Sequence, residues 1–176
     1  MSHVATEKTG TLETLLARLI PDARTLRNLC LGGAAGLLAW ELFARLVTPE
    51  VIGGPLEPAS LIISLFQNLF GFDPGRPAAE ALHYVTGVAL YPLAYWLLTS
   101  LTLSLGPTAD GVVWGVVTWI LALGLFASLA GLPFMLGFIP LSWMSLVGHM
   151  LYAMVAVTLY FELRGFGRHR DVAVTP

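Results

Sequence analysis

A stretch of 31 residues, from Gly111 to Leu141, contains no Asp, Glu, Lys or Arg, and three other long stretches are nearly as apolar. A helix that crosses a bilayer needs about 20 mostly apolar residues. Hydrophobic residues make up 56% of the chain and charged residues 11%. The sequence therefore predicts an all-α membrane protein, a bundle of four transmembrane helices.

The predicted membrane domain covers residues 28–163. The turn at 106–110 separates two spans, with Thr108 or Asp110 as a candidate helix cap. Pro92 is expected to kink the second span, because proline leaves the carbonyl of Val88 without its usual helical partner. The expected segments are the N-terminal segment 1–27, spans at about 28–47, 79–101, 111–131 and 141–163, and a basic tail at 164–176.

The distribution of Lys and Arg predicts the orientation of the spans. Four of these cations precede the first span and three follow the fourth, whereas the long loop between spans one and two holds only Arg76. Cytoplasmic segments carry the excess of Lys and Arg. We expect a multi-pass protein of a bacterial cytoplasmic membrane, with both termini in the cytoplasm. The first 27 residues lack the hydrophobic core of a cleavable signal peptide.

Two shorter apolar segments are expected to form helices on the membrane surface. Thr11–Ile20 places leucines on one face beside a basic run, which is typical of an amphipathic helix on the cytoplasmic surface. Pro58–Phe70 is too short to span the bilayer and lies in the long outer loop. We expect it to be interfacial or re-entrant.

Spaced small residues indicate an internal repeat. Gly32-x3-Gly36-x3-Trp40 in span one matches Gly111-x3-Gly115-x3-Trp119 in span three, and Ala79-x3-His83-x3-Gly87 in span two matches Ser145-x3-His149-x3-Ala153 in span four. Residues four apart share a helical face, and small residues allow membrane helices to approach closely. The pattern predicts two parallel two-helix repeats, with helix packing at Gly32, Gly36, Gly87, Gly111, Gly115 and Ala153.

Four ionisable residues form the candidate intramembrane polar site: Glu41, Arg45, His83 and His149. Such residues are costly in a bilayer and are often functional. We expect Glu41 within hydrogen-bonding or one-water reach of a histidine, with Arg45 closing the network and His149 as the more important partner. The alternatives are structural pairing, a proton- or solute-handling site, and haem b held by both histidines. A lipid or quinone pocket could also be walled by Trp40, Trp119, Tyr84 and Tyr91.

Several segments resemble the YagU-like family of small bacterial inner-membrane proteins, which have no established biochemical activity. The resemblance lies in the segment Gly111-Val-Val-Trp-Gly115, in Ala130-Gly131-Leu132, in Val147-Gly148-His149-Met150, in the basic tail from Arg164, and in Trp40-Glu41 before a proline-rich loop. It implies a bacterial inner membrane and an intramembrane Glu and His. The family's lysine before the Trp-Glu region is absent, since Leu38 and Ala39 stand there.

Nothing in the sequence indicates catalysis or nucleic-acid binding. No nucleophile elbow, phosphate-binding glycine loop, HExxH or dinucleotide fingerprint occurs. We expect a non-enzymatic membrane protein without a cofactor or bound metal, either an accessory subunit of a membrane complex or a stress-related membrane factor. The expected partners are the lipid bilayer and another membrane protein or a second copy. The alternative functions are a small transporter or channel and a haem-binding bundle.

Overall fold

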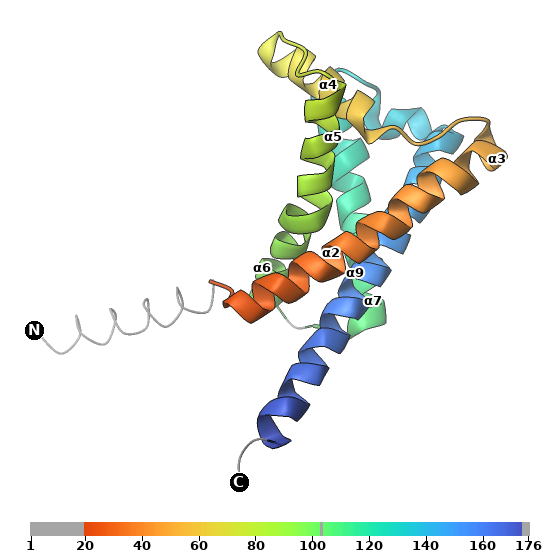
Figure 1. Ribbon diagram of the computed structural model, residues 1–176. Coiled ribbons are helices and arrows are strands. Elements are labelled where there is room, and N and C mark those ends of the chain that lie inside the picture. The colour runs from red at the N-terminus through yellow and green to blue at the C-terminus, as the bar shows by residue number, and fades with distance from the viewer. Residues whose placement is uncertain (1–19, 103, 174–176) are drawn as a thin grey trace, which may run out of the picture.

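A computed structural model describes residues 20–102 and 104–173, with side chains described as far as residue 165. These residues form helices joined by turns, without a strand (Figure 1). Four of the helices are long and apolar enough to cross a membrane. The prediction of an all-α, four-span membrane bundle is therefore confirmed. The surface helix expected at Thr11–Ile20 lies outside the described residues, apart from Ile20.

The four spans begin and end somewhat differently from the expected segments. The first runs from Ala23 to Ile52, the second from Arg76 to Leu101 and the third from Pro107 to Leu129. The fourth helix begins at Pro140 and continues to Ala173, through most of the expected tail. The elements are α2 (Ala23–Leu42), η1 (Phe43–Val47), α3 (Thr48–Ile52), α5 (Arg76–Val85), η2 (Thr86–Leu90), α6 (Tyr91–Leu101), α7 (Pro107–Trp119), η3 (Ile120–Phe126), α8 (Ala127–Leu129) and α9 (Pro140–Ala173).

Local signals explain where these helices begin and stop. The carboxylate of Asp22 accepts the Thr25 N–H at 2.6 Å and caps α2, and this bond lowers the pKa of Asp22. Gly53 ends α3 with a φ of +79°, a left-handed conformation that glycine adopts without steric cost. Pro92 is the second residue of α6, just after the π-helical turn η2, so the second span departs from α-helical geometry close to the proline.

The connection between spans one and two contains α4 (Pro58–Phe70), with the bounds expected from the sequence. Ala59 of α4 is buried, and Leu61 packs against a small core around Trp119 and Leu123. The Asn68 side chain donates to the carbonyl of Leu129 at 2.9 Å. Figure 1 shows α4 at one end of the bundle, opposite the start of α2 and the C-terminal end of α9. We call it the α4 end.

The α4 end also holds the 3-10 turn η4 (Phe134–Phe138), which connects the third and fourth spans. Met135, Leu136 and Phe138 have φ values of 52° to 55° there. Left-handed backbone costs about 1–2 kcal/mol for each residue with a side chain. Burial of Met135 in the small core around Trp119 helps to offset this cost.

Helix α9 forms the centre of the bundle and contacts the first and third spans through glycines. Gly32 and Gly36 of α2 lie against the backbone of α9, where a Cβ added to Gly32 would be 2.5 Å from the carbonyl oxygen of Ala156. A Cβ added to Gly115 of α7 would be 2.6 Å from the Cα of Met150. Ala153 of α9 is fully buried. Both glycine stripes thus contact the same helix, α9.

The second span packs on a different face of α2. Gly87 of η2 lies against the side chain of Leu37. Gly33, outside the expected stripes, lies against the backbone of η2, where an added Cβ would be 2.5 Å from the carbonyl oxygen of Val88 and 2.7 Å from that of Gly87. Adjacent glycines of α2 therefore allow close approach to two neighbouring helices. The internal duplication itself stays a prediction.

Candidate functional site

Glu41 and Arg45 form an ion pair in the C-terminal half of the first span. They are four residues apart, so they lie on one side of the helix. The Nε of Arg45 donates to Oε2 of Glu41 at 2.6 Å. The Glu41 side chain is 16% exposed, whereas that of Arg45 is 58% exposed. The carboxylate is therefore enclosed by the protein and the guanidinium extends toward the surface.

His83 of α5 approaches the same carboxylate from the second span. Its Nε2 lies 3.3 Å from Oε1 of Glu41, and its side chain is 17% exposed. The approach falls within ion-pair range, but its geometry does not make a hydrogen bond, and Nε2 is buried without another hydrogen-bond partner. The two oxygens of Glu41 thus face different partners: Oε1 faces the imidazole and Oε2 the guanidinium.

A second ion network adjoins the first. Arg76, at the start of α5, donates through Nε to Oε1 of Glu80 at 3.0 Å and through its terminal nitrogen to Oε1 of Glu57 at 3.3 Å. The hydroxyl of Ser60 donates to the other oxygen of Glu57 at 3.0 Å. These hydrogen bonds, that of Ser60 first, hold the pKa of Glu57 below its usual value. Arg76 therefore ties the segment before α4 to α5.

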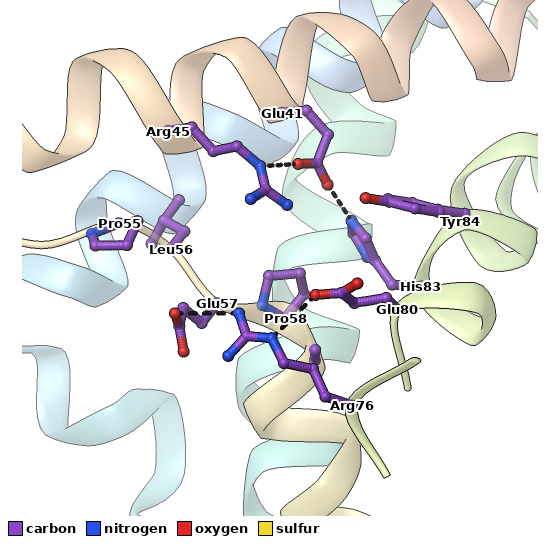
Figure 2. Close-up of a pocket in the computed structure, with 11 residues that line it drawn as sticks. Glu41, Arg45, Pro55, Leu56, Glu57, Pro58, Arg76, Glu80, His83 and Tyr84 are labelled. Atoms are coloured by element: carbon purple, nitrogen blue, oxygen red, sulfur yellow. Dashed lines mark hydrogen bonds and ion pairs between the residues drawn. The ribbon is translucent and has the colours of Figure 1, made fainter. Parts of the chain in front are cut away.

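The two networks surround one cavity of about 30 Å³. Figure 2 shows Arg45 and Glu41 above this space, His83 and Tyr84 to one side, and Arg76 with Glu57 and Glu80 below. Pro55, Leu56, Pro58 and Ala59 complete its wall. A cavity of this volume with several polar neighbours has room for a water molecule. We call these side chains the polar cluster: Glu41, Arg45, Glu57, Arg76, Glu80 and His83.

The structure places His149 apart from this cluster. Its Nδ1 donates to the carbonyl of Ser145, one turn earlier in α9, at 2.7 Å. The indole of Trp40 stands near His83 and near the residue that precedes His149: its ring centroid is 5.0 Å from that of His83, and a Cβ added to Gly148 would be 2.9 Å from its Nε1. The cluster thus pairs Glu41 with His83 rather than with His149, the partner that we expected to matter most.

The space beside His83 is small compared with a haem. A bis-imidazole site needs both rings to face one porphyrin-sized space. Trp40 packs on His83 and on Gly148, the residue before His149, so the indole fills space beside His83. The cavity at His83 has only about 30 Å³. Among the described residues no group of three or more His, Cys, Asp or Glu side chains is arranged to hold a metal ion.

A buried carboxylate, that of Asp110, lies at the opposite end of the bundle. The sequence predicts Asp110 only as a candidate helix cap. Asp110 is 7% exposed and accepts from the Tyr95 hydroxyl at 2.8 Å, the Ser104 hydroxyl at 2.6 Å and the Leu105 N–H at 2.8 Å. The N-cap of α7 is Gly106, without a side-chain bond. Asp110 thus reaches back to the preceding loop and joins the second span to the third.

Comparison of this chain with protein-family models, curated proteins and solved structures finds no match. The resemblance to the YagU-like family therefore stays a prediction.

Proposed function

We propose that this integral membrane protein is non-enzymatic and acts as an accessory subunit of a membrane assembly. The observation that carries this proposal is the polar cluster, in which the charged groups contact one another around a space of about 30 Å³. A site of this kind fixes helices in place and offers no room for an organic substrate. The cluster links α2, α5 and the segment before α4.

The outward surface of α2 supports association with a partner helix. Leu31, Leu38, Leu42 and Leu46 are 49% to 65% exposed. The spacing of the first three, seven and four residues, places them along one side of α2, and Leu46 follows in η1. The glycines of α2 are not available to a partner helix, because Gly32, Gly33 and Gly36 already lie against helices of the same chain. A leucine row of this kind suits contact with an apolar helix or with lipid.

The experiment is site-specific photo-crosslinking in the native membrane, with the photoreactive residue at Leu38. Leu37, 9% exposed, is the matched control because it faces the second span. The proposal predicts a discrete adduct with another membrane protein from position 38 and none from position 37. Adducts with lipid alone, together with a solitary monomer after extraction in mild detergent, would contradict the subunit role.

A proton-conducting transporter is the second candidate, and the contact of His83 with Glu41 favours it. An imidazole beside a carboxylate is suited to proton relay. The cavity limits the cargo to a proton or a water molecule, since larger solutes do not fit. Proton flux into proteoliposomes should then disappear in the double variant Glu41→Gln, His83→Gln. Equal flux in this variant and in wild type would reject the transporter.

The same proposal places the protein in a bacterial inner membrane, with both termini in the cytoplasm. The described ends of α2 and α9 lie on one side of the bundle, and α4 on the other (Figure 1). A cysteine introduced at Gly71, after replacement of Cys30 by serine, should react with an impermeant maleimide added outside. Reaction only after the cytoplasmic side is opened would reverse the topology.

A further inference from the structure

The charges around the cavity do not balance. Three carboxylates, those of Glu41, Glu57 and Glu80, face two guanidinium groups, those of Arg45 and Arg76. With a neutral imidazole at His83, one excess negative charge remains. One added proton makes the polar cluster neutral.

An uncompensated charge is most expensive beside Glu41 and His83, whose side chains are 16% and 17% exposed, whereas the other charged side chains of the cluster are 36% to 58% exposed. Charged groups within a bilayer are stabilised by partners of opposite sign, and an unpaired charge favours uptake or loss of a proton. His83 is a polar group of the cluster that has no hydrogen bond at a buried nitrogen. Nε2 of His83 can therefore take the added proton, and it lies 3.3 Å from Oε1 of Glu41.

The surroundings of His83 suit a cation. The ring centroid of Trp40 lies 5.0 Å from that of His83, and the ring centroid of Tyr84 lies 5.6 Å from it. Aromatic rings attract a cation within about 6 Å of their centroid. An imidazolium at this position would be flanked by two such rings and by the carboxylate of Glu41.

Charged and titratable groups approach His83 from each neighbouring element. The first span contributes Glu41 from α2 and Arg45 from η1, helix α5 contributes Arg76, Glu80 and Tyr84, and the segment before α4 contributes Glu57. From α9 the titratable residue on this side is His149, whose Nδ1 is bonded to its own helix and whose ring is close enough to His83 to influence it electrostatically. Arg45 and Arg76 oppose a positive charge on His83, whereas the three carboxylates favour it.

We infer that the polar cluster is a binding site for one proton, taken up from the aqueous phase at the α4 end and held by His83 against Glu41. A hydronium ion gives its proton to the imidazole, so that a new N–H bond forms and a water molecule is left. The cluster then changes from one net negative charge to neutrality. The site gives the membrane protein a sensitivity to pH on one side, whatever partner it binds.

The test is an NMR titration of the full chain in nanodiscs, with isotope-labelled histidine. The signal of His83 is assigned by its loss in His83→Gln. Glu80→Gln removes one carboxylate, so the cluster is neutral without the extra proton, and the titration midpoint of His83 should fall by about one pH unit. Arg76→Gln adds to the imbalance, so the midpoint should rise by a similar amount. Opposite shifts in these two variants are the expected result.

Matched controls make the outcome decisive. Glu80→Asp retains the charge and should titrate like wild type, and Glu162→Gln, outside the cluster, should leave the midpoint unchanged. If Glu80→Gln does not fold, the comparison of Arg76→Gln with Glu80→Asp still tests the inference. The inference is overturned if the titration midpoint of His83 is the same in wild type and in all the charge variants. It is also overturned if His83 does not titrate between about pH 4 and 9. Failure of this test leaves the crosslinking test of the subunit role unaffected.

Discussion

Substitution of Gly33 by alanine tests the close packing of the first two spans. A Cβ at this position would lie 2.5 Å from the carbonyl oxygen of Val88, 2.6 Å from Cγ of Pro92 and 2.7 Å from the carbonyl oxygen of Gly87. Ordinary van der Waals contact begins at 3.4 Å. Helix α2 must therefore move about 0.9 Å away from η2, the difference between 3.4 and 2.5 Å, because two of the three opposing atoms belong to the backbone.

The expected magnitude is the balance of two effects. Alanine gains about 0.5–1 kcal/mol over glycine inside a helix, while overpacking of a well-filled contact costs about 1–3 kcal/mol. The rigid backbone at Gly33 favours the upper part of that range, so Gly33→Ala should lower the free energy of unfolding by about 1–2 kcal/mol.

Gly165 is the matched control, because it lies in helix α9 with nothing within 4 Å of an added Cβ. Gly165→Ala should be neutral or stabilise the protein by up to about 1 kcal/mol. Both free energies are measured by reversible SDS unfolding of the reconstituted protein, followed by tryptophan fluorescence. If Gly33→Ala is as stable as Gly165→Ala, the packing of α2 against η2 is not as close as the structure has it.

Three further predictions concern the ends of the bundle. Tyr95→Phe should lower the free energy of unfolding by about 1–3 kcal/mol in the same assay, because buried Asp110 loses one of its three donors; an unchanged value would show that this bond adds nothing. The pKa of Glu57 is lowered in the folded protein, chiefly by the hydrogen bond from Ser60, so its stabilising contribution is complete above its usual value of 4.5 and is lost as the pH falls below it. The melting temperature should fall less on acidification in Glu57→Gln than in wild type, and equal slopes would refute this. A spin label is attached to Phe70→Cys, in a chain with its single cysteine replaced. It should collide more with oxygen than with a water-soluble nickel complex, because α4 exposes aromatic side chains at the depth of the span ends. The reverse ratio would place α4 in water.

The spans and their glycine contacts were accessible from sequence because they depend on residue type and spacing. Gly32, Gly36, Gly111 and Gly115 all lie against a neighbouring helix. The pair of Glu41 with Arg45 was likewise visible as a spacing of four on one helix. The helix Pro58–Phe70 was marked by its proline at the start and by its apolar run, and the glycine that follows it ends the helix.

Contacts between helices were harder to predict, because they depend on how each helix is rotated. The sequence favoured His149 as the partner of Glu41, because small residues flank it and allow a neighbouring helix to come close. In the structure Trp40 packs on His83 and Gly148, and His149 bonds its own helix. Arg76 was used only to orient the chain, and its bond to Glu57, 19 residues away, leaves no periodic signal.

The interaction between Glu41 and His83 is tested most directly by a double-mutant cycle. Stability is measured for wild type, Glu41→Gln, His83→Gln and the double variant, at about pH 5 and about pH 8, on either side of the usual imidazole titration. The structure predicts a coupling energy of about 0.5–3 kcal/mol, larger at the lower pH because an imidazolium attracts the carboxylate. A parallel cycle of Glu41 with Glu162, four helical turns beyond Gly148 on α9, should give none. Strictly additive effects of Glu41→Gln and His83→Gln at both pH values would contradict the contact on which the polar cluster is built.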